Sequence, residues 1–328
     1  MTIDYRSQYD KVFSILPNVP VILWARDPRT SEQIDNLEGI RLPSNAGSRP
    51  QGVKAPKATR ARQVFERLEG QTPENMYTST ESRKMIIGVV WMPALRERLL
   101  EAYNIPPHGN SIELPNIVDF CQESCIQKYH KPAVIFVGRL DPYKRPWLMV
   151  ELAISFPNVE FWVLGRSHFD NSNSYKIKHD HDRPLPANVK LLGQKTGQAK
   201  WKLLGAAWFL ISTSAHEGLA ISYLEALSCQ TPVLSTVDPG KFVSSYGVFT
   251  GEFSGSGMQG LSALKQGFKT LLFDQSLREK LGEEGRKHVL ETHNADQFYN
   301  GFQSIINRMD LPHSSRNQTS TKMSTSVH

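Results

Sequence analysis

The sequence has few cysteines, no long apolar run and no secretory leader. Its three cysteines, Cys121, Cys125 and Cys229, are too few for a disulfide framework and have no histidine pattern beside them that would complete a zinc site. Small buried thiols in a reducing compartment are the better interpretation. No apolar run approaches the ~20 residues that a membrane-spanning helix needs, and the first residues lack the basic-then-apolar form of a signal peptide. We therefore expect a cytoplasmic protein.

Aromatic residues are scarce where positive charge is concentrated. The chain carries a net charge of +6, and residues 41–70 hold seven basic residues but only the two acidic residues Glu66 and Glu69. Phe65 is the only aromatic side chain in that segment, which argues against base stacking and hence against a nucleic-acid partner. Its prolines and glycines favour a solvated loop, with weak contact to an anionic membrane surface as the second interpretation.

The sequence also offers no convincing metal site. A polar insert from Ser167 to Ala187 contains His168, His179 and His181 together with three aspartates. This insert is rich in serine, asparagine and lysine and has no companion ligands on regular structure. A solvated loop is therefore the expected structure, and no metal is predicted.

The 328 residues, of which 39% are hydrophobic and 21% charged, suit two globular domains of the α/β class. Short apolar runs bounded by turn residues predict buried strands, and helical spacing of apolar residues predicts helices over 258–309. The expected strands of the second domain lie at 133–137, 159–165, 189–193, 207–211 and 232–235.

The most informative stretch runs from His216 to Ala226. Glu217 follows an apolar strand and a polar turn, so it stands at the carboxyl end of a predicted parallel strand, where ligands of open α/β sheets bind. Glu225 lies eight residues later, a spacing that predicts both carboxylates on one side of a single helix. Gly218 between them would let an anionic ligand approach the first backbone N–H groups of that helix.

With its surroundings, this stretch resembles a known family motif. Glu217-Gly218, Glu225-Ala226-Leu227 and Thr231-Pro232-Val233-Leu234 follow the order of the E-x(7)-E motif in retaining family 4 glycosyltransferases (glycosyl transferases group 1), which have the two-lobed GT-B fold. The chain departs from the usual pattern at Ala220 and Gln230, where the family has glycines. The alternative interpretation is an ordinary pair of glutamates on a solvated helix face.

The resemblance implies roles for individual residues. Glu217 would contact the sugar hydroxyls of the donor and Glu225 its ribose. Arg139 and Lys144 match the family's arginine and lysine that bind the donor diphosphate, where two fixed cations neutralise the leaving group, so that no metal or other cofactor is implied. Glu217, Arg139 and Lys144 form the predicted catalytic set. Further donor-binding positions are Gly138, Gln194, Lys195, Gly218 and Leu219.

The same resemblance predicts the domain organisation: a short or truncated N-terminal acceptor-side lobe over 1–130, a complete Rossmann-like donor lobe over 131–310 and a disordered tail over 311–328. In the family, the last helix crosses back onto the first lobe. Residues 112–119 resemble the segment that ends that lobe, with Ile117 in place of a glycine. The family's opening strand and glycine-rich loop have no counterpart before Val19. The family's catalytic-site histidine also has no match, because His108 lies too late in the lobe.

The expected function is transfer of a sugar, of the hexosyl type, from a nucleoside-diphosphate sugar to an acceptor hydroxyl with retention of anomeric configuration. The acceptor, whether glycan, lipid or small molecule, and the nucleotide base are left open. The shortened first lobe keeps two alternatives in view: a non-catalytic nucleotide-sugar binder or a subunit completed by a partner. The third alternative is a sugar-nucleotide epimerase of the same fold, which the E-x(7)-E pattern disfavours.

Overall fold

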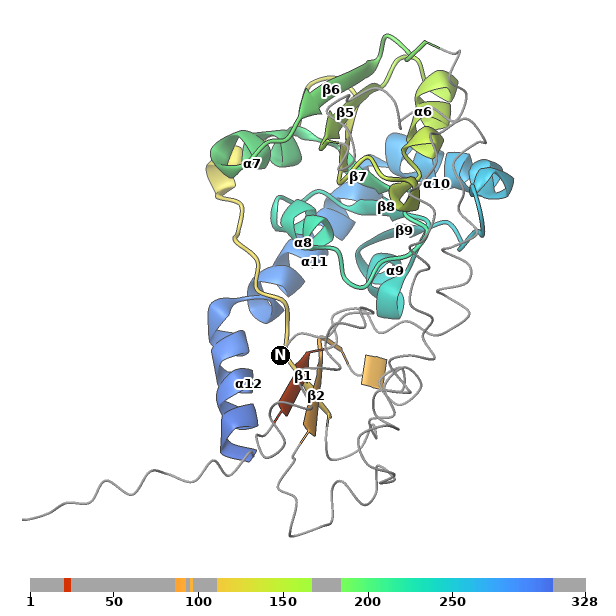
Figure 1. Ribbon diagram of the computed structural model, residues 1–328. Helices are drawn as coiled ribbons and strands as arrows, with labels where there is room; N and C mark the ends of the chain where they lie inside the picture. The colour runs from red at the N-terminus through yellow and green to blue at the C-terminus, as the bar shows by residue number, and fades with distance from the viewer. Residues whose placement is uncertain (1–20, 25–85, 93–94, 97–110, 167–183, 309–328) are drawn as a thin grey trace, which may run out of the picture.

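The computed structural model describes residues 21–24, 86–92, 95–96, 111–166 and 184–308 (Figure 1). The basic segment 41–70, His108, the histidines of the polar insert and the tail from Leu311 therefore lie outside the described residues. Within the described ranges, no helix has the length and apolar character needed to cross a membrane.

The larger sheet has six parallel strands in the order β6-β5-β4-β7-β8-β9. The chain starts at the middle strand β4, moves outward to β5 and β6, and then returns to β7 on the opposite side of β4 before reaching β8 and β9. This order places a topological switch point between β4 and β7. The strands are β4 (Ala133–Val137), β5 (Glu160–Leu164), β6 (Val189–Gly193), β7 (Phe209–Ser212), β8 (Val233–Ser235) and β9 (Gly247–Phe249).

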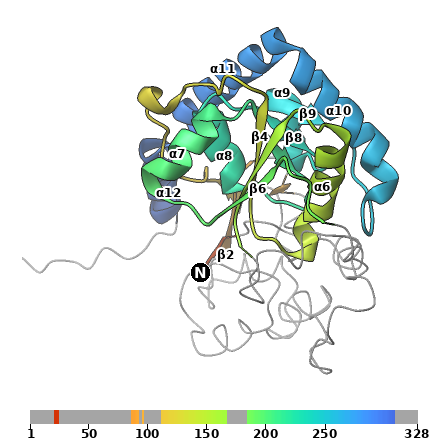
Figure 2. The same cartoon turned by 90° about the horizontal axis from the view of Figure 1, so that it is seen from above.

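Helices cover both faces of this sheet (Figure 2). Side chains alternate along each strand, so Val134 and Phe136 of β4 pack on one face while Ala133 and Ile135 pack on the other. The first face is covered by α6 (Pro146–Ser155) and α10 (Leu261–Phe273). The second face is covered by α7 (Gly197–Ala206), α8 (Ile221–Ser228), α9 (Phe242–Tyr246) and α11 (Gln275–Thr292).

The smaller sheet consists of the three parallel strands β1 (Val21–Trp24), β2 (Ile86–Val90) and β3 (Ser111–Glu113). The last helix, α12 (Ala295–Arg308), packs against it (Figure 1). Ile305 of α12 is fully buried with Val89, Ile112 and Leu114. This confirms the expectation that the final helix returns to the first lobe.

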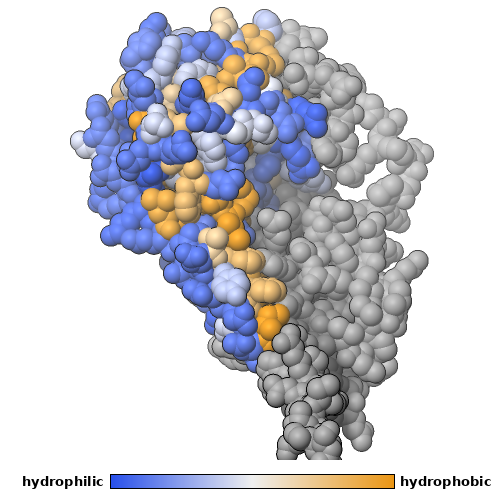
Figure 3. All heavy atoms as spheres, turned by 90° about the vertical axis from the view of Figure 1, so that its left-hand side faces the viewer, coloured by the Kyte–Doolittle hydropathy of each residue, from blue (hydrophilic) through white to orange (hydrophobic). Residues whose placement is uncertain are grey.

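The described surface of the protein is mostly polar, with one apolar region. On the face shown in Figure 3, hydrophilic side chains dominate, and an apolar band runs along the border with the residues drawn in grey. Phe298 and Phe302 of α12 are only half-buried against the small core and stack with ring centroids 6.2 Å apart.

Residues 114–130 connect the two sheets and are held to the second lobe by hydrogen bonds. The backbone N–H of Cys121 donates to Ser228 Oγ over 3.2 Å, and Arg286 donates to the carbonyl of Cys121 over 3.1 Å. Just beyond α11, the Nδ1 atom of the buried His293 lies 2.9 Å from the carbonyl oxygen of Asn116. The three cysteines are free and buried, as the sequence predicted.

Candidate functional site

The candidate site lies at the switch point, where the carboxyl ends of β4 and β7 meet. The turn after β4 contains Arg139 and Lys144, and it includes the short 3-10 helix η4 (Pro142–Lys144). The loop after β7 runs from Thr213 to Ala220 and contains Glu217. Because β4 and β7 pair directly and in parallel, both segments leave the sheet at the same edge.

A close backbone approach fixes the end of β4 against β5. Gly138 N donates to Leu164 O over 3.0 Å, and Leu140 N donates to Arg166 O over 3.2 Å. Gly165 has φ +150°, and a Cβ atom on it would overlap the carbonyl oxygen of Gly138. Glycine is therefore required at position 165 both for its backbone angle and for the space it leaves.

The turn after β4 presents two cations. The amide of Lys144 donates to Asp141 O over 2.9 Å, which closes the 3-10 turn. Arg139 NH1 lies 3.1 Å from Asp141 Oδ2; the Asp141 side chain is buried, whereas that of Arg139 is 57% exposed. The buried carboxylate thus orients a guanidinium that still faces solvent.

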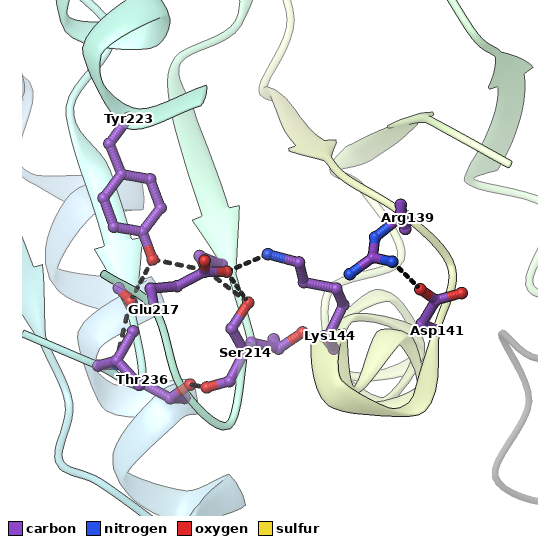
Figure 4. A network of polar contacts seen from close by, with 11 residues as sticks. Arg139, Asp141, Lys144, Ser214, Glu217, Tyr223 and Thr236 are labelled. Carbon is purple, nitrogen blue, oxygen red and sulfur yellow. Dashed lines mark hydrogen bonds and ion pairs between the residues drawn. The ribbon is translucent and has the colours of Figure 1, made fainter. Parts of the chain in front are cut away.

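Lys144 and Glu217 meet at the centre of the site (Figure 4). The ammonium of Lys144 contacts Glu217 Oε1, and Ser214 Oγ donates to the same oxygen over 2.6 Å. Both side chains are mostly enclosed, with 22% of Lys144 and 13% of Glu217 exposed. Arg139 and Asp141 lie on the far side of Lys144 in this view.

Neutral hydroxyl groups support the loop that carries Glu217. Burial raises the pKa of the Tyr223 phenol, and the negative charge of Glu217 raises it further, so Tyr223 remains a neutral hydrogen-bond donor at physiological pH. Tyr223 donates to Ser212 Oγ over 2.7 Å, and Thr236 Oγ1 donates to the carbonyl of Ser214 over 2.8 Å. These bonds fix the start of the loop at the end of β7.

The prediction that Glu217 and Glu225 share one helix is wrong. Helix α8 begins at Ile221, after an extended Ala220 with φ −66° and ψ 128°, so Glu217 and Gly218 lie in the preceding loop. The loop is held away from helical geometry because Ala215 N donates to Tyr143 O over 2.8 Å, in the turn after β4. Gly218 therefore lies two positions before the N-cap residue Ala220, and its role in donor binding stays a prediction.

Glu225 has a different neighbour. It lies on α8, and its Oε1 contacts the ammonium of Lys200, which comes from α7. Lys200 also lies 5.0 Å from the ring centroid of Trp201. The two glutamates are thus each paired with a lysine, Glu217 with Lys144 and Glu225 with Lys200.

The remaining predicted positions lie around this centre. Gly138 directly follows β4, while Gln194 and Lys195 follow β6 at the edge of the sheet and are exposed. The side chain of Leu219 packs in the core between the sheet and α8, so only its backbone faces the loop.

The sequence interpretation missed Thr213, Ser214, Tyr223 and Lys200. The polar turn 212–214 was visible in the sequence, but nothing there indicated which hydroxyl would reach Glu217. Lys200 stands 25 positions before Glu225, and no spacing rule links two helices that meet only in the folded chain. Among the described residues, no group of three histidines, cysteines or acidic residues is arranged to hold a metal ion.

Comparison with known proteins places this geometry in context. The family model for glycosyl transferases group 1 matches residues 126–288. No curated protein matches the sequence.

Solved structures resemble the fold at low identity. Sucrose-phosphate synthase of Thermosynechococcus elongatus has a TM-score of 0.65 at 16% identity. The alignment covers 92% of this chain and 71% of the synthase chain. Anabaena HepE in complex with UDP and glucose has a TM-score of 0.62 at 14% identity, covering 92% and 76%. A point mutant of S. aureus TarM in complex with fondaparinux, alpha-GlcNAc-glycerol and UDP has a TM-score of 0.55 at 19% identity, covering 79% of this chain. This chain spans only 48% of that TarM chain.

Proposed function

Through residues 126–288 the chain belongs to the glycosyl transferases group 1 family and has the GT-B fold, and we propose that it transfers a sugar from a nucleoside-diphosphate sugar to an acceptor hydroxyl with retention of anomeric configuration. The observation that carries the proposal is the contact between Lys144 and Glu217 at the switch point, with Arg139 in the same turn. A cation pair for a leaving group and a carboxylate for a sugar stand together at the ligand-binding edge of the sheet.

The chemistry assigned to the two cations is charge neutralisation. In the transfer, the bond between the anomeric carbon and the phosphate oxygen breaks with its electron pair remaining on the diphosphate. The acceptor oxygen then bonds to the same face of the sugar, and the proton of the acceptor hydroxyl passes to the departing diphosphate. An ammonium has three N–H donors, so Lys144 can contact Glu217 and a phosphate oxygen together. The exposed guanidinium of Arg139 supplies further donors for a second phosphate oxygen.

The glutamates take opposite ends of the donor. Glu217 binds the sugar hydroxyls and favours the positive charge that develops at the anomeric carbon. Glu225 binds the ribose, with Lys200 holding its carboxylate. Gln194 and Lys195, after β6, lie towards the base. No metal is required, because Arg139 and Lys144 do the work of a divalent cation.

The choice of first donors follows from the similar structures. Both HepE and TarM are complexes with UDP, so UDP-sugars head the panel, and GDP- and ADP-sugars follow. A donor that binds only the folded protein raises the melting temperature by mass action. If no nucleotide sugar in the panel stabilises the protein, the proposed function is wrong.

A turnover assay with the stabilising donor separates the reaction classes. Release of nucleoside diphosphate, slow in water and faster with an acceptor, supports a transferase. Binding without release would instead indicate a non-catalytic binder or a subunit that needs a partner, and interconversion of the donor sugar would indicate an epimerase. The acceptor and a weak membrane contact through residues 41–70 remain predictions.

A further inference from the structure

Arg145, directly after Lys144, occupies an energetically costly position. Its side chain is charged yet only 1% of the residue is exposed. Its backbone lies in the left-handed region, with φ 43° and ψ 52°, which non-glycine residues rarely adopt. Within the described part of the chain, its NH1 nitrogen has no hydrogen-bond partner. Backbone strain and a buried charge at one residue call for a compensating role.

The guanidinium binds a loop from another part of the fold. Arg145 Nε donates to the carbonyl of Gly255 over 3.0 Å, and its NH2 contacts the carbonyl of Phe253. Both carbonyls belong to the glycine-rich loop between β9 and η6 (Met258–Gly260), which begins at the carboxyl edge of the sheet. Although burial lowers the pKa of Arg145 to about 10, its side chain remains positively charged at neutral pH.

The backbone of Arg145 is equally tied to the site. Arg145 N donates to Pro142 O over 3.0 Å, which ends the 3-10 turn that carries Lys144. Thr213 Oγ1 lies 2.6 Å from the carbonyl of Lys144 and 2.9 Å from that of Arg145. A displaced Arg145 would therefore shift both the Lys144 turn and the start of the Glu217 loop.

We propose that Arg145 is a positioning residue: by bonding the 253–255 carbonyls it fixes the turn after β4, so that the Lys144 ammonium is held beside Glu217 and towards the donor diphosphate. This inference rests on the proposed function. It adds a residue that does not touch the donor but sets the affinity of the site for it, and it assigns the 253–255 loop the role of a support.

A double-mutant cycle tests this coupling. Nucleoside diphosphate binding (UDP, GDP and ADP as probes) is measured by calorimetry for the wild type, Arg145→Met, Lys144→Ala and the double variant. If Arg145 acts through Lys144, Arg145→Met should weaken binding about tenfold in the wild type but less than about twofold in the Lys144→Ala background, because coupled residues are not additive. Arg145→Lys, which keeps the charge but cannot fork to two carbonyls, should recover part of the affinity.

Trp147→Phe is the matched control. Trp147 Nε1 donates to Ser256 O over 2.8 Å, so this variant removes a hydrogen bond between the same loop and α6. It should leave diphosphate affinity within about twofold. Should Arg145→Met fail to fold, the cycle is run with Arg145→Lys.

Three outcomes would overturn the inference. The first two are equal losses in both backgrounds and a loss for Trp147→Phe as large as that for Arg145→Met, because each would mean that Arg145 only stabilises the fold. In either case wild-type binding, and with it the proposed function, stands. If the wild type binds none of the three diphosphates, the proposed function and this inference fail together.

Discussion

At the scale of single residues, the two glutamates have different neighbours and should fail differently when changed. Glu217 is held by Lys144 and Ser214 beside the position assigned to the sugar, so Glu217→Gln should lower kcat by about 100-fold and donor affinity by much less. Glu225→Gln should raise the donor KM by about tenfold with kcat near wild type, because its contact is made equally in the ground state and the transition state. Steady-state kinetics with the donor identified by the panel measures both.

If the protein shows no turnover, the two glutamate variants should still differ in binding. Glu225→Gln should lower the affinity for free nucleoside diphosphate, whereas Glu217→Gln should lower only the affinity for the sugar-bearing donor. Wild-type behaviour of both variants would mean that neither carboxylate contacts the donor.

Lys144 and Arg139 offer a second test at this scale. Lys144→Ala and Arg139→Ala should each weaken the binding of nucleoside diphosphate by about 1.5–3 kcal/mol, which is the contribution of a hydrogen bond to a charged group. Lys190→Ala is the control: Lys190 forms an ion pair of 2.7 Å with Glu160, the first residue of β5 and hence at the opposite edge of the sheet. Unchanged affinity in both site variants, measured by calorimetry, would contradict the diphosphate assignment.

At the scale of secondary-structure elements, the close approach of β4 and β5 supports the whole site. Gly165→Ala would push a Cβ atom into the carbonyl of Gly138, so we expect a loss of at least about 3 kcal/mol in the free energy of unfolding. Gly193→Ala is a matched control, because Gly193 also has a positive φ, +69°, but no atom lies within 4 Å of the added Cβ. It should cost only about 1–2 kcal/mol of backbone strain.

Urea denaturation of the three proteins decides this prediction. Equal losses for the two glycine variants would show that backbone angle alone, and not the contact with Gly138, makes glycine necessary at position 165.

At the scale of the whole molecule, the buried His293 anchors the segment that connects the two lobes by contacting Asn116. Burial, together with the charge of the neighbouring His288, lowers its pKa from 6.5 to about 4. Between these values the unfolded chain binds a proton that the folded chain does not, so stability should be full above pH 6.5 and fall as the pH drops towards 4. The expected loss is about 3 kcal/mol.

His293→Gln should flatten this pH dependence. Burial also lowers the pKa of His288, so His288→Gln should flatten the part of the pH dependence that remains. Unfolding free energies measured by urea titration between pH 4 and pH 7 test the prediction, and a slope unchanged in His293→Gln would contradict it.

The sequence by itself determined five of the six strands in the sheet of the second lobe, the helices after residue 258 and the residue types at the ligand-binding edge. Apolar runs bounded by turns located β4, β5, β7 and β8, because a strand buried on both faces needs a continuous apolar segment. The half-buried edge strand β6 was found from a similar run. The resemblance around Glu217 and Glu225 led to the family, and position after a strand was enough to place Arg139, Lys144 and Glu217 at one edge of a parallel sheet.

Only the tertiary structure decided which of these residues meet. Lys144 and Glu217 are 73 positions apart, and the return of the chain from β6 to β7 is what brings their loops together. The start of α8 was misjudged because contacts with the turn after β4, which no local pattern reveals, override the helical spacing of the glutamates. The role inferred for Arg145 likewise depends on a loop more than 100 positions later in the chain. Local propensity acts over a few residues, whereas a site is assembled by long-range packing.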